Sequence, residues 1–244
     1  MFTGIIKEVG KLNKVSRINT GLEIEVGSLF LTKDMKNGDS IAVNGCCLTV
    51  NNFASGKSFN ADVSFSTLKA TNLGSLRPGS HLNLEDAVKP GDKLGGHMVS
   101  GHIDCTGKII NILKKGDFYL LELKIPKDII ALAAPKGSMS VDGISLTISD
   151  SFNAAVSFAI IPFTFQNTSL KYKKKGESVN LEVDLMARYI SNMAKYGSPM
   201  TQRTFGSAGD YANILNMYKL KSDLQNKNRD AELKEKLEKN GFKK

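Results

Sequence analysis

The strongest constraint on the fold is an internal repeat. Three motifs recur in the same order: VNGCCLTV at residue 43 matches VDGISLTI at 141, FTGII at 2 matches VSGHI at 99, and LNLE at 82 matches VNLE at 179. The glycines of FTGII and VSGHI are 97 residues apart, and residues 44 and 142 are 98 apart. This period exceeds the roughly 20–50 residues of solenoid repeats and matches a small domain. We therefore expect two copies of one fold, whose differences reveal function.

Cysteine usage and the apolar runs predict a cytoplasmic chain without a membrane span. The sequence has no basic N-terminal stretch followed by an apolar run, and no apolar run approaches the roughly 18 residues that cross a bilayer. Cys46 and Cys47 are adjacent and do not normally bridge, and with Cys105 they lack the CxxC spacing of a zinc site. Free thiols indicate a reducing compartment. His97 and His102 point to opposite faces of an extended strand, so no metal site is expected.

The net charge of +9 does not by itself predict nucleic-acid binding. Residues 185–244 hold 12 Lys and Arg against 6 Asp and Glu, so most of the excess lies in the last quarter. Lysines at 171 and 173–175 flank a turn-like Gly176, and we interpret them as a solvated turn rather than a phosphate-binding patch. The chain has no Trp and 7% aromatic residues, which argues against base stacking. We expect no nucleic-acid partner.

Apolar and polar residues alternate with period two in both copies. The clearest runs are 22–26, 59–65, 119–125 and 179–185, and Gly, Asn and Asp separate such runs at short intervals. Many short strands at regular spacing indicate an antiparallel barrel or sandwich. The sequence therefore predicts an all-β fold.

Two dipeptides, Asn44-Gly45 and Asp142-Gly143, predict two-residue hairpins because both tolerate the positive φ of a type I′ turn. Side-chain alternation then gives each hairpin one polar, uncharged face. These faces carry Ser40, Ala42, Cys47 and Thr49 in the first copy and Ser138, Ser140, Ser145 and Thr147 in the second. Solvent faces usually carry Lys and Glu, so we favour ligand-facing surfaces over ordinary solvent faces.

The region after the repeats changes period. Apolar residues at 185, 186, 189, 190, 193 and 194 form one helical stripe. A lone helix of this size is marginal in water, so the stripe must pack on the barrels or on another subunit. Residues 197–210 resemble a linker, and 231–240 are predicted to form a second, charged helix with Gly241 as its C-cap.

Six segments carry a family resemblance when taken together and in order. They are MFTGII, GDSIAVNGCCLTV, GGHMVSGHIDCTG, VDGISLT, IPFTFQNTSL and VNLEVD. The chain closely resembles the alpha-type riboflavin synthases from residue 1 to about 195. The resemblance implies two tandem homologous six-stranded antiparallel Greek-key barrels followed by a C-terminal α-helix. It implies lumazine-binding barrels at 1–96 and 97–187, and a trimerisation helix and tail at 188–244.

The resemblance also implies an activity. In this reaction one molecule of 6,7-dimethyl-8-ribityllumazine gives a four-carbon unit to another, which yields riboflavin and 5-amino-6-(ribitylamino)pyrimidinedione. No metal or redox cofactor is implied. The implied assembly is a homotrimer with active sites between the first barrel of one subunit and the second barrel of its neighbour. Lumazine synthase is a further implied partner.

Carried over onto this sequence, the resemblance assigns one pocket to each barrel. The first-barrel pocket comprises Phe2 at its mouth, Gly4, Ile5, Ile6, Cys47, Leu48, Thr49, Asp62, Val63, Ser64, Phe65, Ser66 and Thr67. The second-barrel pocket comprises Gly101, His102, Ile103, Lys136, Ser145, Leu146, Thr147, Ala159, Ile160, Ile161, Pro162, Phe163 and Thr164. Ser40, Cys47, His102, Ser145 and Asp184 match positions implicated in the chemistry. Family members often have a polar residue where this chain has Phe163.

The reaction requires two substrate molecules with unequal roles. One lumazine loses a proton from its acidic 7-methyl group, and the other accepts a nucleophile at ring carbon 7. Our hypotheses are that His102 or a Ser145–Asp184 pair assists proton removal, and that Cys47, Ser40 or bound water adds to the donor ring. A free thiol with an ordinary pKa of about 8.5 needs help to ionise.

The alternative is a non-catalytic antenna protein that binds lumazine or flavin. Such proteins share the duplicated barrel, so fold alone does not separate the two functions. The joint presence of Cys47, His102, Ser145 and Asp184 favours the enzyme.

Overall fold

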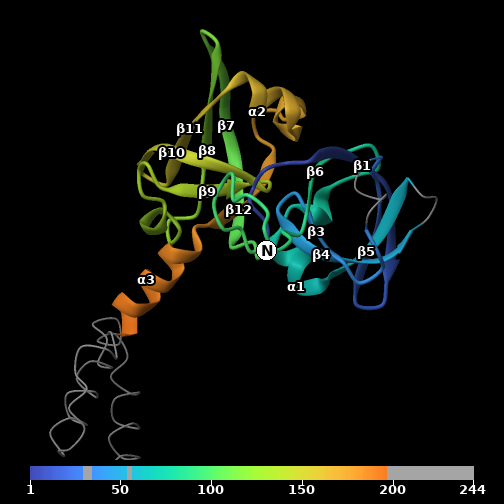
Figure 1. Ribbon diagram of the computed structural model, residues 1–244. Helices are drawn as coiled ribbons and strands as arrows, with labels where there is room; N and C mark the ends of the chain where they lie inside the picture. The colour runs from blue at the N-terminus through green and yellow to red at the C-terminus, as the bar shows by residue number, and fades with distance from the viewer. Residues whose placement is uncertain (30–34, 54–56, 197–244) are drawn as a thin grey trace, which may run out of the picture. The chain divides into compact units, whose positions relative to one another are not determined.

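The structure is a computed structural model that describes residues 1–29, 35–53 and 57–196 (Figure 1). The linker expected at 197–210 and the charged helix expected at 231–240 lie outside these residues. Among the helices of the described ranges, none has the length and apolar character that a membrane span needs.

The first copy forms a closed antiparallel barrel of six strands. The strands are β1 (Glu8–Ile18), β2 (Gly21–Gly27), β3 (Ser40–Val43), β4 (Cys46–Phe53), β5 (Ser58–Ser64) and β6 (His81–Asp86). Around the barrel they follow the order β1, β2, β5, β4, β3, β6, and β6 pairs with β1 to close it. These strands run from blue to teal in Figure 1.

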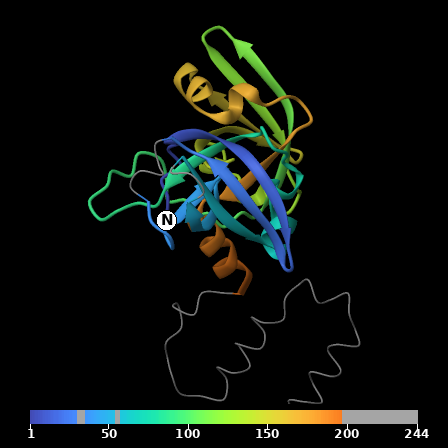
Figure 2. The ribbon, with the colours of Figure 1, turned by 90° about the vertical axis from the view of Figure 1, so that its right-hand side faces the viewer.

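The second copy repeats this topology. Its strands are β7 (Cys105–Lys115), β8 (Phe118–Lys124), β9 (Ser138–Val141), β10 (Ile144–Phe152), β11 (Ala155–Ile160) and β12 (Ser178–Val183). Their order is β7, β8, β11, β10, β9, β12, again closed. Register shifts also recur at equivalent places, after Leu12 in β1 and after Ile109 in β7. The predicted duplication of one all-β fold is confirmed. The β7–β8 hairpin is drawn green in both views (Figure 1, Figure 2).

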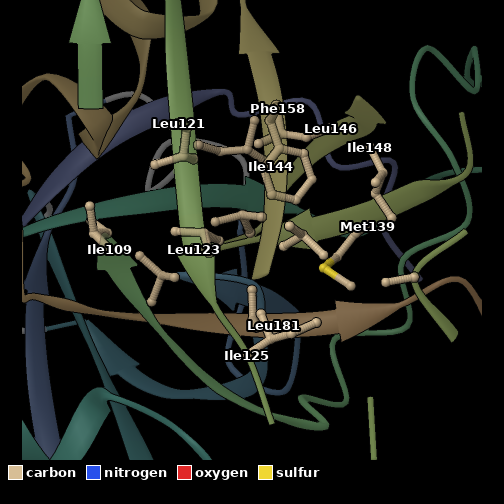
Figure 3. Packing of buried hydrophobic residues seen from close by; sticks show 14 of the residues in the cluster. Ile109, Leu121, Leu123, Ile125, Met139, Ile144, Leu146, Ile148, Phe158 and Leu181 are labelled. Carbon is tan, nitrogen blue, oxygen red and sulfur yellow. The ribbon is translucent and has the colours of Figure 1, made fainter. Parts of the chain in front are cut away.

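Each barrel encloses its own apolar core. Figure 3 shows side chains of the second core, where Leu121 and Leu123 of β8 lie in one cluster with Met139 of β9 and Phe158 of β11. All four are at most 1% exposed. Burying one such side chain contributes about 1.5–3 kcal/mol relative to leaving it in water. The alternating pattern therefore supplies each copy with its own driving force for closure.

Short helices lie between the strands, and one longer helix follows the last strand. They are α1 (Phe65–Ala70), η2 (Leu73–Ser75), η3 (Ile130–Leu132), α2 (Pro162–Asn167), η4 (Ser169–Tyr172) and α3 (Leu185–Tyr196). The Phe165 ring of α2 stacks on the Tyr119 ring of β8, with centroids 3.7 Å apart. The helix predicted for the stripe that begins at residue 185 is confirmed as α3.

One predicted strand ends earlier than its alternation suggests. Phe65 continues the apolar period of β5, yet it begins α1 and is 76% exposed. The reason is the preceding Ser64, whose hydroxyl oxygen accepts a hydrogen bond from the backbone nitrogen of Thr67 at 3.2 Å. A serine N-cap of this kind starts a helix and so ends the strand.

Both predicted hairpin turns form with the predicted register. Asn44 and Gly45 have φ values of 46° and 77°, and Asp142 and Gly143 have 44° and 83°. In the first hairpin Ser40 pairs with Thr49, and the second hairpin repeats the pattern. The two turns lie against each other, because a Cβ placed on Gly45 would be 2.6 Å from the backbone nitrogen of Gly143.

Two buried asparagines join the barrels beside these turns. Alternation along β12 would place Asn180 on a solvent face, but it is fully buried, as Asn83 of β6 almost is. The Asn83 side chain donates to the carbonyl of Asp142 and the Asn180 side chain donates to the carbonyl of Asn44, each at 2.9 Å. The oxygen of each asparagine accepts a backbone N–H from the other copy at 2.6 Å. Buried amides that are satisfied in this way fix how the copies meet.

One lysine of the run beside Gly176 is not solvated as the sequence predicted. Lys173 is largely buried in an ion pair. Lys173 Nζ lies 2.8 Å from Asp142 Oδ2, and the two side chains are 9% and 0% exposed. Sequence spacing gave no sign of this pair, because 31 positions separate the residues. The neighbouring lysines 171, 174 and 175 are exposed, as expected.

Candidate functional site

Each hairpin is completed by backbone from the other copy. The backbone nitrogen of Ser145 in β10 donates to the carbonyl of Gly4 at 2.8 Å, and that of Cys47 in β4 donates to the carbonyl of Gly101 at 2.9 Å. The segments that precede β1 and β7 are therefore exchanged between the copies. Each candidate pocket contains residues from both.

This exchange corrects the pocket assignment carried over from the family. Gly4, Ile5 and Ile6 were assigned to the first-barrel pocket, but Ile6 packs on the core of the second barrel. Gly101, His102 and Ile103 were assigned to the second-barrel pocket, but Ile103 packs on the core of the first. Period-two alternation does not indicate which hairpin a preceding segment will contact, so the residue pattern alone could not predict the exchange.

The close approach requires glycine at both crossing points. Gly4 has a φ of +76°, and a Cβ there would lie 2.6 Å from Ser145 Cβ. Gly101 has a φ of +84°, and a Cβ there would lie 2.5 Å from Cys47 Cβ. Both the backbone conformation and the available space exclude larger side chains. Ser145 and Cys47 therefore occupy equivalent positions, each in contact with the backbone of a glycine from the other copy.

Two buried glutamates hold the exchanged segments. Glu85 Oε1 accepts from the backbone nitrogen and the hydroxyl of Thr3 at 2.6 and 2.7 Å, and Oε2 accepts from the nitrogen of Gly4 at 3.0 Å. Glu182 binds Ser100 and Gly101 in the same way, at 2.7, 2.7 and 2.9 Å. Burial raises the pKa of Glu85, while the hydrogen bonds from Thr3 and Gly4 oppose this. Each clamp fixes the loop that enters the other barrel's pocket.

Ser145 has a histidine partner that the sequence reasoning missed. His97 Nδ1 lies 2.7 Å from Ser145 Oγ, within the range of a nucleophile–base or relay pair. His97 is 9% exposed, and its Nε2 has no hydrogen-bond partner among the described residues. The hypothesised Ser145–Asp184 pair is not hydrogen bonded in the described part of the chain; Asp184 Oδ1 accepts from the nitrogen of Met186 at 2.8 Å.

The environment of His97 keeps its ring neutral near neutral pH. Burial lowers the pKa of His97 below its ordinary value of 6.5, and the negative charge of Asp184 opposes this shift. A neutral imidazole can accept a proton. The only sequence signal for His97 was its position within GGHMVSGHI, whereas the family resemblance directed attention to His102.

The first-barrel counterpart of Ser145 has different surroundings. Cys47 is half-buried and packs in a cluster with Phe2, Ala42 and Val99. A Cβ on Gly101 would also lie 3.0 Å from a Phe2 ring carbon, so the aromatic ring is at this crossing point. Burial raises the pKa of the adjacent Cys46 to about 12, which keeps that thiol protonated. Of the two neighbouring cysteines, Cys47 alone is placed for ligand chemistry.

The hairpin faces are only partly available to a ligand. Ala42 and Ser140 are 2% and 1% exposed, because the exchanged segments cover them. The outer parts, which include Ser40, Thr49 and Thr147, remain partly or fully exposed.

The remaining residues predicted to contact the substrate differ in whether their side chains are accessible to a ligand. Leu48, Val63, Leu146 and Ile160 are buried in the cores, so a ligand can reach only their backbone. Polar or exposed side chains are presented by Asp62, Ser64, Phe65, Ser66 and Thr67 in the first copy and by Lys136, Ala159, Ile161, Pro162, Phe163 and Thr164 in the second.

Comparison with known proteins identifies the family to which this chain belongs. The model of the lumazine binding domain matches residues 3–87 and 100–184. A riboflavin synthase of Actinobacillus pleuropneumoniae is 42% identical over 190 residues, which cover 78% of this chain and 88% of the relative. One of Bacillus amyloliquefaciens is 36% identical over 215 residues, which cover 86% and 100%. The chain belongs to the riboflavin synthase family.

Solved structures agree with this membership. LumP complexed with riboflavin has a TM-score of 0.71 and 25% sequence identity, and the match covers 75% of this chain and 99% of LumP. The two segments that match the lumazine binding domain begin at Thr3 and Ser100, the residues held by the buried glutamates. His97 lies between the two segments, in the connector of the riboflavin synthase fold.

Proposed function

We propose that this protein is a riboflavin synthase that converts two molecules of 6,7-dimethyl-8-ribityllumazine into riboflavin and 5-amino-6-(ribitylamino)pyrimidinedione. One observation carries the proposal beyond family membership. Equivalent hairpins of the two copies carry unequal chemistry, with Cys47 beside Phe2 in one and Ser145 beside His97 in the other. A dismutation of two identical molecules needs such a pair of pockets.

The Ser145–His97 pair is suited to proton transfer. His97 is neutral near pH 7 because burial lowers its pKa. A proton from the 7-methyl group of a lumazine beside Ser145 can pass to the serine oxygen while the serine proton passes to Nδ1, 2.7 Å away. Asp184 then stabilises the resulting imidazolium electrostatically, since its charge raises the pKa of His97. His97 thereby replaces Asp184 as the partner of Ser145 in our hypothesis.

The Cys47 pocket is suited to the other molecule. Cys47 and Ser40, or water held beside them, are the candidates for addition to ring carbon 7. His102 is exposed, and its segment crosses to the first barrel, where the carbonyl of Gly101 accepts from the nitrogen of Cys47. We therefore assign His102 to proton transfer at the addition step rather than at the Ser145 pocket. Orientation of two rings against each other can itself supply several kcal/mol of the barrier reduction.

The assembly is part of the proposal. We infer a homotrimer in which the first-barrel pocket of one subunit faces the second-barrel pocket of its neighbour. The exposed apolar side chains of α3 support an intersubunit role: Met186, Tyr189, Ile190 and Met193 are 46–64% exposed. Sedimentation of the purified protein tests this. A cytoplasmic location and contact with lumazine synthase stay predictions, and co-sedimentation with lumazine synthase tests the contact.

The activity is tested by incubating the purified protein with 6,7-dimethyl-8-ribityllumazine, without added cofactor, and measuring riboflavin by chromatography. Riboflavin at half the molar amount of substrate consumed supports the proposal. Tight lumazine binding without product would instead identify an antenna-type binding protein and would reduce the site residues to ligand contacts.

A further inference from the structure

The loop that carries His102 has a second anchor besides Glu182. Arg188 lies in the first turn of α3, and its Nη2 donates to the carbonyl of His102 at 2.8 Å. The same guanidinium binds both oxygens of Asp104, with Nε at 3.0 Å from Oδ1 and Nη2 at 2.8 Å from Oδ2. A bidentate arginine–carboxylate pair has a fixed planar geometry that lysine does not reproduce.

Asp104 connects this pair to the barrel. Asp104 Oδ2 also accepts from the backbone nitrogen of Val183 at 2.8 Å, and the Asp104 nitrogen donates to the carbonyl of Leu181 at 2.9 Å. The Arg188 and Asp104 side chains are 27% and 20% exposed, so solvent only partly screens the pair. The guanidinium therefore spans from the end of β12 and the start of α3 to the substrate loop.

The internal repeat shows that the barrel does not require this anchor. The first-copy position equivalent to Asp104 holds Lys7, and Arg188 lies beyond the repeated segments 3–87 and 100–184, so the first copy has no such pair. The first copy nevertheless closes the same six-stranded barrel, and its exchanged segment is held by Glu85. The pair is thus specific to the loop that enters the first-barrel pocket.

We propose that Arg188 is a positioning residue for the loop 101–103, and that it sets the geometry of the Cys47 pocket without affecting the Ser145 pocket. The inference rests on the proposed function, since it treats the loop as part of one of two ligand sites. It predicts that changes at Arg188 act on one of the two sites of each chain.

The test compares riboflavin binding by the full-length protein and its variants R188Q, R188K and E85Q. Riboflavin fluorescence quenching and calorimetry resolve the binding classes. Thr49→Trp and Thr147→Trp, which obstruct the first and second pockets, assign each class to a pocket. E85Q is the matched control, because Glu85 holds the loop of the other pocket. Thermal unfolding of every variant is recorded in parallel.

We expect R188Q to raise the Kd of the class that T49W removes about tenfold and to leave the other class within about twofold. R188K should fall between R188Q and the unaltered protein, because lysine keeps the charge pair but loses the fork to both Asp104 and the His102 carbonyl. E85Q should show the opposite selectivity. A purely structural role would lower the unfolding temperature without selecting one class.

Equal weakening of both classes by R188Q, or no weakening of either, would overturn the inference. The proposed function fails separately: riboflavin binding with no turnover of lumazine would overturn the enzymatic proposal and leave the positioning role intact. Absence of riboflavin binding by the unaltered protein would overturn both.

Discussion

Replacing Lys173 with leucine tests how the second copy compensates a buried charge. Lys173 Nζ lies 2.8 Å from the fully buried Asp142 carboxylate. The other carboxylate oxygen accepts hydrogen bonds from the nitrogen of Asn180 at 2.7 Å and from the side chain of Asn72 at 3.1 Å. The first copy has Asn44 and Leu76 at the two equivalent positions, so it carries neither charge. The K173L variant leaves a buried carboxylate with hydrogen bonds but no cation.

The magnitude follows from the loss of one partner of a buried ion pair, which typically costs about 3–5 kcal/mol. We therefore expect K173L to lose about 3–5 kcal/mol of unfolding free energy at pH 7. D142N/K173L reproduces the first copy and should recover most of the loss.

The assay is equilibrium urea unfolding at pH 7, followed by circular dichroism. Protein concentration is held constant, because association of subunits shifts apparent stability by mass action. The unaltered protein, K173L, D142N and the double variant form a complete cycle. A loss below about 1 kcal/mol for K173L would refute the reasoning that Lys173 compensates a buried charge.

Four further outcomes are expected. His97→Gln should lower kcat/KM by about 10²–10⁴-fold in a steady-state assay, and unchanged turnover would remove His97 from the mechanism. The acid limb of the pH profile of kcat/KM should lie below pH 6.5, because burial lowers the pKa of His97. Asp184→Asn should move this limb to still lower pH, because the charge of Asp184 raises the pKa of His97. A limb that moves to higher pH in this variant contradicts the role of His97 as the base. Cys47→Ser should slow turnover, and an unchanged rate excludes a thiol nucleophile. Gly101→Ala should destabilise by about 1–3 kcal/mol more than Gly79→Ala in thermal unfolding, since both have positive φ but only Gly101 faces a side chain.

The hairpins could be predicted from sequence because their signals are local. Asn44-Gly45 and Asp142-Gly143 supply the positive φ values of the turns, and a two-residue loop fixes the register of both strands. Alternation likewise identified β2, β5, β8 and β12, since each barrel buries one face of its sheet. These signals depend only on residues within about ten positions of one another.

The exchanged segments and the seam between barrels could not be predicted, because they depend on contacts across the whole repeat. Asn180 reads as a solvent-facing residue in an alternating strand, yet it binds the turn of the other copy, 136 positions away. The sequence pattern predicts that Lys173 is solvent-exposed like the other lysines beside Gly176. His97 lies outside the repeated motifs, and only the fold places it beside Ser145. Burial of polar groups is decided by partners that are distant in sequence.

The differences between the copies separate into two kinds. At the turns, Asn44 of the first copy is replaced by Asp142 in the second, where Lys173 forms an ion pair with the new carboxylate. The hairpin keeps the same register despite the added charge. At the pockets, the change from Cys47 to Ser145 is accompanied by different neighbours, Phe2 in one and His97 in the other. Two identical pockets would treat both lumazines alike, whereas dismutation requires one molecule to be deprotonated and the other to be attacked. Under the proposed function, duplication supplies two matched sites for the lumazine rings, and the difference between Cys47 beside Phe2 and Ser145 beside His97 supplies the inequality that the reaction needs.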